Sequence, residues 1–89
     1  MTWALRLSKK AVADLAWFRE KDRKIYVKCF DLTLALLEDP FLGIGKPERL
    51  KNLGGNVWSR RITLEHRLVY EIFEDLIVIV AYRHHYGKR

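Results

Sequence analysis

The sequence predicts an α+β fold in which two N-terminal helices pack on one face of a small antiparallel β-sheet. Two patterns indicate this class. Apolar residues recur at helical spacing in the first half of the chain, and short extended segments alternate with turn residues in the second half. A chain of 89 residues has material for one modest hydrophobic core. We therefore expect residues 1–89 to form a single domain.

The N-terminal segment predicts one short strand followed by a helix. Residues 3–7 alternate between apolar and polar side chains, which is typical of a half-buried strand. Ser8 has the features of a helix N-cap, because its hydroxyl can accept hydrogen bonds from the free N–H groups of a first helical turn. The helix after it carries an apolar stripe made of Ala11, Leu15 and Phe18.

A second helix is expected from residue 23 to about residue 39. Asp22 is its predicted N-cap, and Pro40 ends it because the residue before a proline is pushed out of helical geometry. Its apolar stripe consists of Ile25, Cys29, Leu32 and Leu36. The single cysteine excludes an intramolecular disulfide and is interpreted as a small buried residue.

The second half of the chain predicts a three-stranded meander. Glycine-rich stretches precede three extended segments at residues 57–62, 66–73 and 76–82. Only Glu74 and Asp75 separate the last two, which predicts an antiparallel hairpin. If both helices cover one face of this sheet, the polar strand residues must lie on the opposite, open face.

Charge and hydropathy restrict the possible partners. The chain has 17 Lys and Arg against 11 Asp and Glu, and residues 46–67 alone carry six cations and two anions. Clustered cations favour a polyanion such as RNA, the alternative being a generally basic solvated surface. No apolar run approaches the roughly 20 residues that span a membrane, and no secretory leader is visible. We expect a cytoplasmic protein without membrane contact.

Four polar clusters are candidates for chemistry, at residues 46–51, 58–62, 66–70 and 82–86. Each cluster alone fits an ordinary surface, but antiparallel strands can bring all four to one edge. Together they match metal-free RNA cleavage, which needs a base for the 2′-hydroxyl, a cation for the phosphorane and an acid for the departing 5′-oxygen. Glu48 provides a base, Arg61 and Arg67 provide cations, and a histidine of the tail provides the acid.

Neither a metal nor another cofactor is expected at these clusters. His84 and His85 are adjacent, so on a strand they point to opposite faces and cannot easily share one ion. No third ligand occurs at a characteristic metal-binding spacing.

The pattern leaves open which histidine faces the site. A two-residue turn at residues 74–75 would place Arg67 opposite Tyr82, on the face that also carries His84. A slip of one residue or a β-bulge would move Arg67 to the face of residues 83 and 85 instead.

Several motifs occur together in one order, at residues 45–48, 50–51, 58–62, 65–70 and 85–86. With these motifs the chain resembles the YoeB (Txe/YoeB) toxins of bacterial type II toxin–antitoxin systems, within the RelE superfamily. The resemblance implies the RelE/YoeB-like microbial ribonuclease fold. It also implies a ribosome-dependent endoribonuclease that cuts translated mRNA in the ribosomal A site and inhibits translation. The implied partners are the ribosome with its rRNA and mRNA, a YefM-type antitoxin, and a second copy in a homodimer.

The resemblance also implies a role for individual residues. Glu48 matches the general base, His85 the general acid and Arg67 the arginine that stabilises the transition-state phosphate. The residues that match positions lining the substrate pocket are Lys51, Arg61 and Tyr86.

The chain departs from the pattern of the family at two places. His84 occupies a position where the best-known relatives have tyrosine, so it introduces a second titrating group. Residues 87–89 extend beyond the usual terminal tyrosine, either as a basic end or as an extra rRNA contact.

Two rival functions are a non-nuclease toxin that binds a protein such as gyrase and a ribosome- or RNA-binding module without chemistry.

Overall fold

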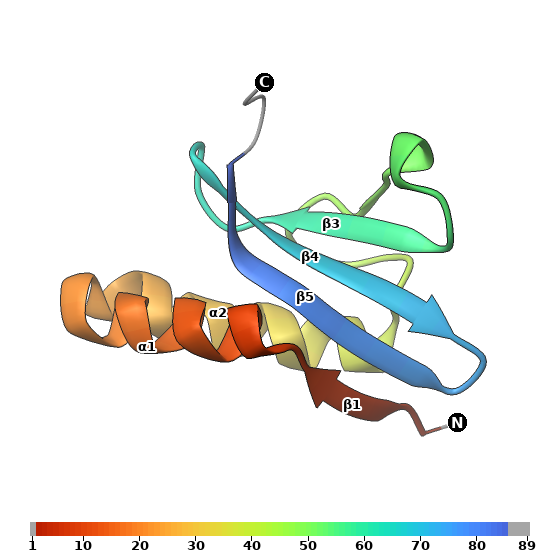
Figure 1. Ribbon diagram of the computed structural model, residues 1–89, viewed down its shortest axis with the longest axis horizontal. Coiled ribbons are helices and arrows are strands. Elements are labelled where there is room, and N and C mark those ends of the chain that lie inside the picture. The colour runs from red at the N-terminus through yellow and green to blue at the C-terminus, as the bar shows by residue number, and fades with distance from the viewer. Residues whose placement is uncertain (1, 86–89) are drawn as a thin grey trace.

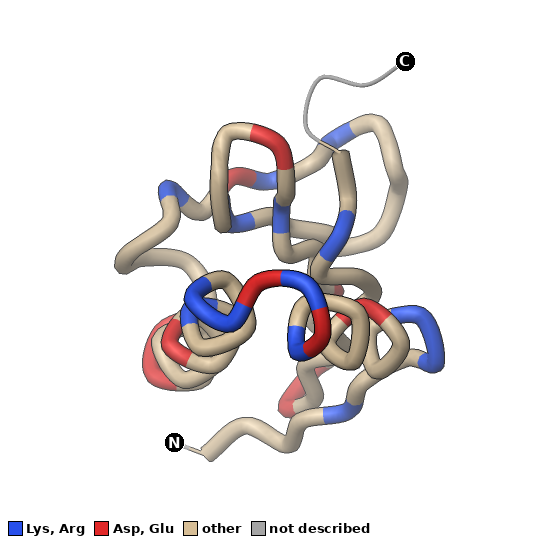
Figure 2. Tube along the Cα trace, turned by 90° about the vertical axis from the view of Figure 1, so that its left-hand side faces the viewer, with Lys and Arg blue, Asp and Glu red and all other residues tan. Residues whose placement is uncertain are grey.

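The computed structural model describes residues 2–85, and it confirms the predicted α+β class with both helices on one face of the sheet (Figure 1). Its elements, in chain order, are β1 (Ala4–Leu7), α1 (Lys9–Lys21), α2 (Arg23–Glu38), β2 (Glu48–Arg49), the 3₁₀ turn η1 (Lys51–Leu53), β3 (Val57–Arg61), β4 (His66–Phe73) and β5 (Leu76–His85). Viewed along their axes, the two helices lie side by side (Figure 2).

The sheet has five strands in the order β1-β5-β4-β3-β2. The pairs β5–β4 and β4–β3 are antiparallel, as the meander predicted, and β3–β2 is antiparallel as well, whereas β1 pairs with β5 in parallel. Two further features were not predicted from the sequence. The two-residue strand β2 adds an edge next to β3, and β5 continues to His85 instead of ending near Tyr82.

Both predicted helix caps are present. The Ser8 hydroxyl accepts a hydrogen bond from the Ala11 N–H at 3.0 Å and donates one to the Val80 carbonyl at 2.7 Å. The same side chain therefore begins α1 and ties that end of the helix to β5. The Asp22 carboxylate accepts from the Ile25 N–H at 3.3 Å and begins α2.

The hydrophobic core lies between the helices and the sheet. From the helices it takes Ala11, Phe18, Cys29, Leu32 and Leu36, and from the sheet side Ile62, Leu68, Tyr70, Ile72, Ile77, Ile79 and Tyr82. Burial raises the pKa of the Cys29 thiol to about 12, which fits its predicted role as a buried apolar residue. The Thr33 hydroxyl donates to the Cys29 carbonyl and lies 2.7 Å from the Tyr82 hydroxyl. A buried hydrogen bond between side chains therefore links α2 to β5 inside the core.

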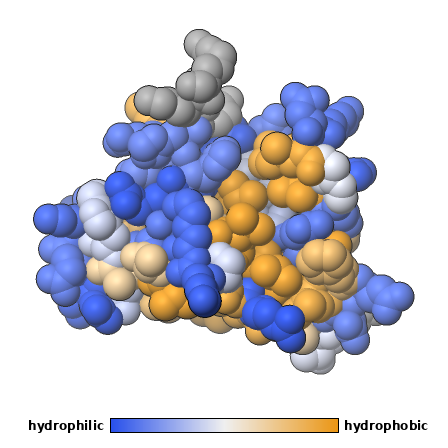
Figure 3. Space-filling model, in the orientation of Figure 1, coloured by the Kyte–Doolittle hydropathy of each residue, from blue (hydrophilic) through white to orange (hydrophobic). Residues whose placement is uncertain are grey.

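The outer surface is mixed in polarity. Apolar side chains gather over β4 and β5 on the face shown in Figure 3, next to a hydrophilic area over α1. Phe73 and Val80 are among the exposed apolar residues of these strands. Within residues 2–85, neither helix combines the length and the apolar character that crossing a lipid bilayer requires.

Candidate active site on the open face of the sheet

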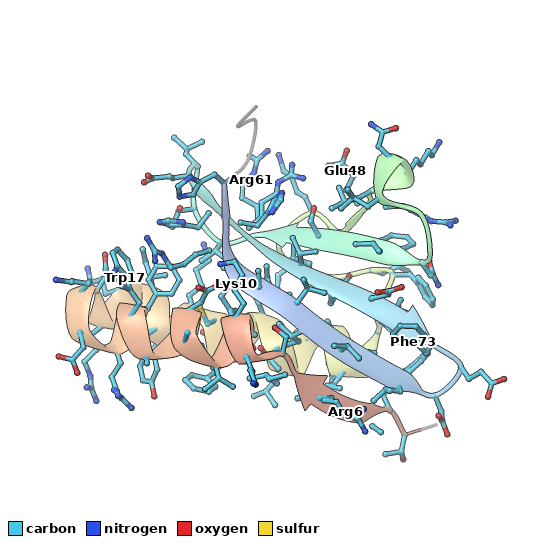
Figure 4. All side chains as sticks on the ribbon, viewed as in Figure 1. Arg6, Lys10, Trp17, Glu48, Arg61 and Phe73 are labelled. Atoms are coloured by element: carbon cyan, nitrogen blue, oxygen red, sulfur yellow. The ribbon has the colours of Figure 1, made fainter. Side chains whose placement is uncertain are left out.

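The face of the sheet that points away from the helices carries most of the predicted site. Directly paired residues of neighbouring antiparallel strands project to the same face. The register pairs Glu48 with Ser59, Arg61 with Arg67, and Arg67 with His84. Figure 4 shows Glu48 and Arg61 on the side of the sheet away from the helices. These five residues, from β2, β3, β4 and β5, are called the open-face cluster below.

Arg67 is the fixed centre of the open-face cluster. Its guanidinium donates to the Ser59 hydroxyl at 2.8 Å and to Glu48 Oε1 at 3.3 Å. Only 7% of Arg67 is exposed, whereas the Glu48 side chain is 60% exposed. A planar guanidinium held on two sides keeps a defined orientation, which suits it to bind an oxyanion. The exposed carboxylate beside it remains accessible to a substrate.

A buried arginine on the other face positions the loop that carries Glu48. Arg60 is fully buried, and its guanidinium donates to the Tyr70 hydroxyl at 3.3 Å and to the carbonyls of residues 39, 42 and 44. The Tyr70 hydroxyl in turn donates to the Pro40 carbonyl at 2.6 Å. Arg60 therefore points to the loop and Arg61 to the open face, as the alternation of side chains along a strand requires.

Gly45 completes the attachment of this loop. Its carbonyl accepts from the Arg61 N–H at 2.6 Å, and its φ of +87° lies in the region that favours glycine. A Cβ on residue 45 would stand 2.9 Å from Leu32 Cδ2 and 3.0 Å from Arg60 Cβ. The backbone can therefore approach β3 this closely only with glycine there, and Glu48 follows three residues later.

The two other predicted contacts have different environments. Arg61 is half-buried next to the centre of the cluster, whereas Lys51 is exposed on η1. Both add positive charge around the single carboxylate of Glu48. Tyr86, the third predicted substrate contact, lies outside the described residues, as do residues 87–89.

The end of β5 does not follow the simple hairpin register. Phe73 pairs with Leu76, as a two-residue turn at residues 74–75 requires, but register shifts on both sides of Val69 bring Arg67 opposite His84 instead of Tyr82. The sequence left open whether Arg67 shares a face with residues 82 and 84 or with residues 83 and 85, and the register places it on the face of His84. One shift of one residue would turn the side chains of β5 to the opposite face of the sheet, and the second shift turns them back.

A carboxylate of α1 holds this irregular segment. Asp14 is 4% exposed, and its Oδ2 accepts hydrogen bonds from the N–H groups of Tyr82 and Arg83, each at 3.0 Å. Lys10 pairs with the same oxygen at 3.0 Å. The Arg83 guanidinium lies 3.6 Å from the centroid of the Trp17 ring, so a cation–π contact also joins the strand end to α1.

The two tail histidines have different neighbours. His84 lies opposite Arg67, and partial burial followed by the positive charges of Arg67 and Lys10 lowers its pKa. His85 pairs with His66, and their ring centroids are 5.5 Å apart. His66 makes an edge contact with Phe18 of α1 at 5.1 Å, which places this second pair on the helix side of the sheet.

The structure thus brings Glu48, Arg61 and Arg67 together, and it adds two residues that the sequence reasoning did not assign to the site, Ser59 and His84. It does not bring His85 into this cluster, so the role of His85 as the acid stays a prediction. Ser59 could have been found from its even spacing to Arg61 along β3, since alternate strand residues share a face. Among residues 2–85, no three His, Cys, Asp or Glu side chains are grouped so that they could hold a metal ion.

Residues 7–86 match the protein family described as YoeB-like toxin of bacterial type II toxin-antitoxin system. Toxin YoeB of Synechocystis sp. is 50% identical over 76 residues, which cover 84% of this chain and 87% of that protein. Toxin YoeB of Escherichia coli K12 is 43% identical over 79 residues, covering 89% and 94%.

Solved structures of YoeB toxins also superpose closely on this chain. The YoeB/ParE toxin from Agrobacterium tumefaciens superposes with a TM-score of 0.86 at 35% identity, covering 93% of this chain and 99% of that one. The YoeB dimer from Staphylococcus aureus gives 0.84 at 38% identity, covering 97% and 100%. The heterotetrameric YoeB-YefM toxin-antitoxin complex from the same organism gives 0.81 at 38% identity, with the same coverage.

Proposed function

The chain belongs to the YoeB-like toxins of bacterial type II toxin–antitoxin systems, and from this premise we propose that it is a ribosome-dependent mRNA endoribonuclease. It would inhibit translation by cutting translated mRNA in the ribosomal A site. The observation that carries the proposal is the contact of Arg67 with Glu48 on the open face. This contact places an accessible carboxylate directly beside an oriented cation.

The proposed chemistry transfers the phosphoryl group within the RNA strand. Glu48 removes the proton of the 2′-hydroxyl, the 2′-oxygen attacks phosphorus, and the bond from phosphorus to the 5′-oxygen breaks. Arg67, with Arg61 beside it, stabilises the negative charge that develops on the non-bridging oxygens. The products are a 2′,3′-cyclic phosphate and a 5′-hydroxyl, and no step in this scheme requires a metal ion.

A histidine at the end of β5 supplies the proton for the departing 5′-oxygen. The His85-Tyr86 motif favours His85 for this role, and it favours Tyr86 and Lys51 as contacts for the substrate. General acid–base catalysis of this kind contributes about 10²–10⁴-fold to a rate.

The proposed partners follow from the relatives and from the charge of the chain. Because toxins of Staphylococcus aureus were solved as a YoeB dimer and as a YoeB-YefM complex, we propose a homodimer and a YefM-type antitoxin for this chain. The net charge of +6 favours docking on rRNA through contacts to phosphate. A ribosomal substrate also implies a cytoplasmic location.

The test is cleavage of a defined mRNA on programmed ribosomes, in the presence of a chelator, with the cut sites mapped by primer extension. The toxin is purified from its antitoxin complex and refolded. We expect cuts inside the codon in the A site that require the ribosome. If the protein binds ribosomes without cutting at any codon, the binding-module alternative replaces the enzyme.

A further inference from the structure

The outer face of α2 carries apolar side chains that do not belong to the hydrophobic core. Val27, Phe30 and Leu34 are spaced by three and four residues, so they lie along one side of the helix, and they are 50%, 42% and 65% exposed. The core takes different residues of the same helix, among them Cys29 and Leu32. A row of exposed apolar side chains indicates a surface that binds another molecule. Val27, Phe30 and Leu34 are called the α2 stripe below.

We propose that the α2 stripe is a self-association surface, on which a second copy of this chain packs its own α2 in antiparallel orientation. The inference rests on the homodimer proposed above and names a surface that holds the two copies together. A YoeB of Staphylococcus aureus was solved as a dimer, so self-association has a precedent among the relatives.

The α2 stripe is complementary to its own copy. A two-fold axis beside Phe30 pairs each residue before Phe30 with a residue after it on the other copy. Phe30 then meets Phe30 of the second copy, and Val27 of each copy meets Leu34 of the other. Every one of these contacts is apolar on both sides. Because both copies use the same surface, the contact closes after two copies and does not continue into a filament.

The same arrangement fills a shallow hollow on α2. The hollow is lined by residues 31, 34, 35, 37 and 38, which all belong to the C-terminal half of the helix. Val27 lies in the N-terminal half and is half exposed. Antiparallel packing therefore places Val27 of one copy over the hollow of the other copy, where a parallel pair would leave the hollow open.

The charges beside the α2 stripe favour the antiparallel orientation. Lys24 and Lys28 are exposed in the N-terminal half of α2, and Asp31 and Glu38 are exposed in its C-terminal half. Two antiparallel copies place Lys28 of one against Asp31 of the other, and Lys24 against Glu38. Parallel copies would place like charges together. Complementary charge fixes the orientation of two surfaces more than it adds to their affinity.

A contact through one pair of helices is small. The 16 residues of α2 extend over about 24 Å at 1.5 Å per residue. Interfaces that bury less than about 1,200 Å² in total are typical of weak complexes. We therefore expect an equilibrium between one and two copies that depends on concentration. High salt should shift the orientation-dependent part of it toward single copies, because salt screens exposed charges.

Sedimentation of the full-length toxin, purified from its antitoxin complex, measures the association constant. Phe30→Glu should weaken association by about tenfold or more, because it places a charge at the centre of an apolar contact. Val12→Glu is the matched control, since Val12 is 55% exposed on α1 and the same change there should leave association unaltered. Both positions are exposed, and far-UV circular dichroism confirms that each variant is folded.

Two charge variants test the pairing of one α2 with another. Lys24→Glu combined with Lys28→Glu makes the flank of the α2 stripe anionic, and Asp31→Lys combined with Glu38→Lys makes it cationic. We expect each variant alone to associate more weakly than the wild type, because like charges then face each other. A mixture of the two should form one-to-one complexes, and high salt should weaken them.

Two results would overturn the assignment of the surface. One is a folded Phe30→Glu variant that associates as strongly as the wild type, which would place the homodimer on another surface. The other is a mixture of the charge variants that associates no better than either variant alone. A wild type that remains a single copy at every concentration would instead refute the homodimer proposal itself.

Discussion

Arg67 and Glu48 are joined by a hydrogen bond of 3.3 Å between a buried guanidinium and an exposed carboxylate. An ion pair can serve catalysis or the stability of the fold, and this difference in burial indicates which of the two applies here. Arg67 is also bound to Ser59 and is part of the sheet, whereas Glu48 projects from a two-residue edge strand. The pair should therefore contribute much to catalysis and little to the stability of the fold.

We expect Glu48→Gln to lower the rate of single-turnover cleavage by about 10²–10⁴-fold, because it removes the base and keeps the shape. The free energy of unfolding should change by less than about 1 kcal/mol, because the carboxylate is exposed and the amide oxygen of glutamine can still accept from the Arg67 guanidinium. Urea denaturation and cleavage on programmed ribosomes measure the two effects. Glu20→Gln removes a carboxylate of α1 that is more exposed still, and it should change neither quantity. Equal cleavage rates for the two variants would contradict the role of Glu48.

Arg60 should show the opposite behaviour, because it is buried and holds the loop in front of β2. Arg60→Met keeps the apolar bulk but leaves the Tyr70 hydroxyl and three loop carbonyls without their donor. Hydrogen bonds to a charged group contribute about 1.5–3 kcal/mol each, so we expect a loss of at least about 2 kcal/mol in the free energy of unfolding. Cleavage should fall as well, because Glu48 follows this loop.

Urea denaturation tests this expectation, with Arg19→Met as the control. Arg19 is exposed on α1 and makes only a 3.9 Å contact with its neighbour Glu20. A change in stability as small as that of the control would show that the loop holds its position without Arg60.

Much of the scaffold was predictable because its signals are local. The caps at Ser8 and Asp22, the stop at Pro40 and the turn at residues 74–75 each depend on a few adjacent residues, and all are present. The opposite directions of Arg60 and Arg61 likewise follow from the alternation of side chains along a strand.

The features that were missed depend on partners far away in the sequence. The parallel pairing of β1 with β5 joins the two ends of the chain, and no local pattern specifies it. The register at His84 depends on Asp14, which precedes Tyr82 by 68 residues. A polar residue next to the apolar stripe of α1 was the available signal, but the N–H groups that donate to it become apparent only in three dimensions.

Asp14 should therefore influence a site that it does not touch. Asp14→Ala leaves the buried N–H group of Tyr82 and the partly buried N–H group of Arg83 without an acceptor, and an unsatisfied buried group costs about 1–3 kcal/mol. We expect lower stability, faster hydrogen exchange at these two amides, and slower cleavage because the end of β5, which carries the tail histidines, loses its fixed position beside Arg67.

Asp14→Asn is the matched variant, because its amide oxygen can still accept both hydrogen bonds. We expect it to retain most of the amide protection and most of the cleavage rate, although it loses the charge that pairs with Lys10. If alanine and asparagine reduced cleavage equally, the charge of Asp14 would be important rather than its hold on β5.

The stability of the fold should fall as the pH drops below neutrality. Burial lowers the pKa of His66 from its ordinary value of 6.5, against the opposing effect of the Glu65 carboxylate, and His85, Arg83 and Asp14 are the other charged or titratable groups around it. In the unfolded chain His66 takes up a proton near its ordinary pKa, whereas in the folded chain it resists protonation until lower pH. The unfolded state therefore binds more protons in this window, and the free energy of unfolding decreases as the pH falls through 6.5 toward the folded pKa.

Urea denaturation between neutral and mildly acidic pH should show this slope, at most about 1.4 kcal/mol per pH unit for one proton. His66→Gln, which cannot titrate, should reduce the slope, and an unchanged slope would assign the effect to other groups.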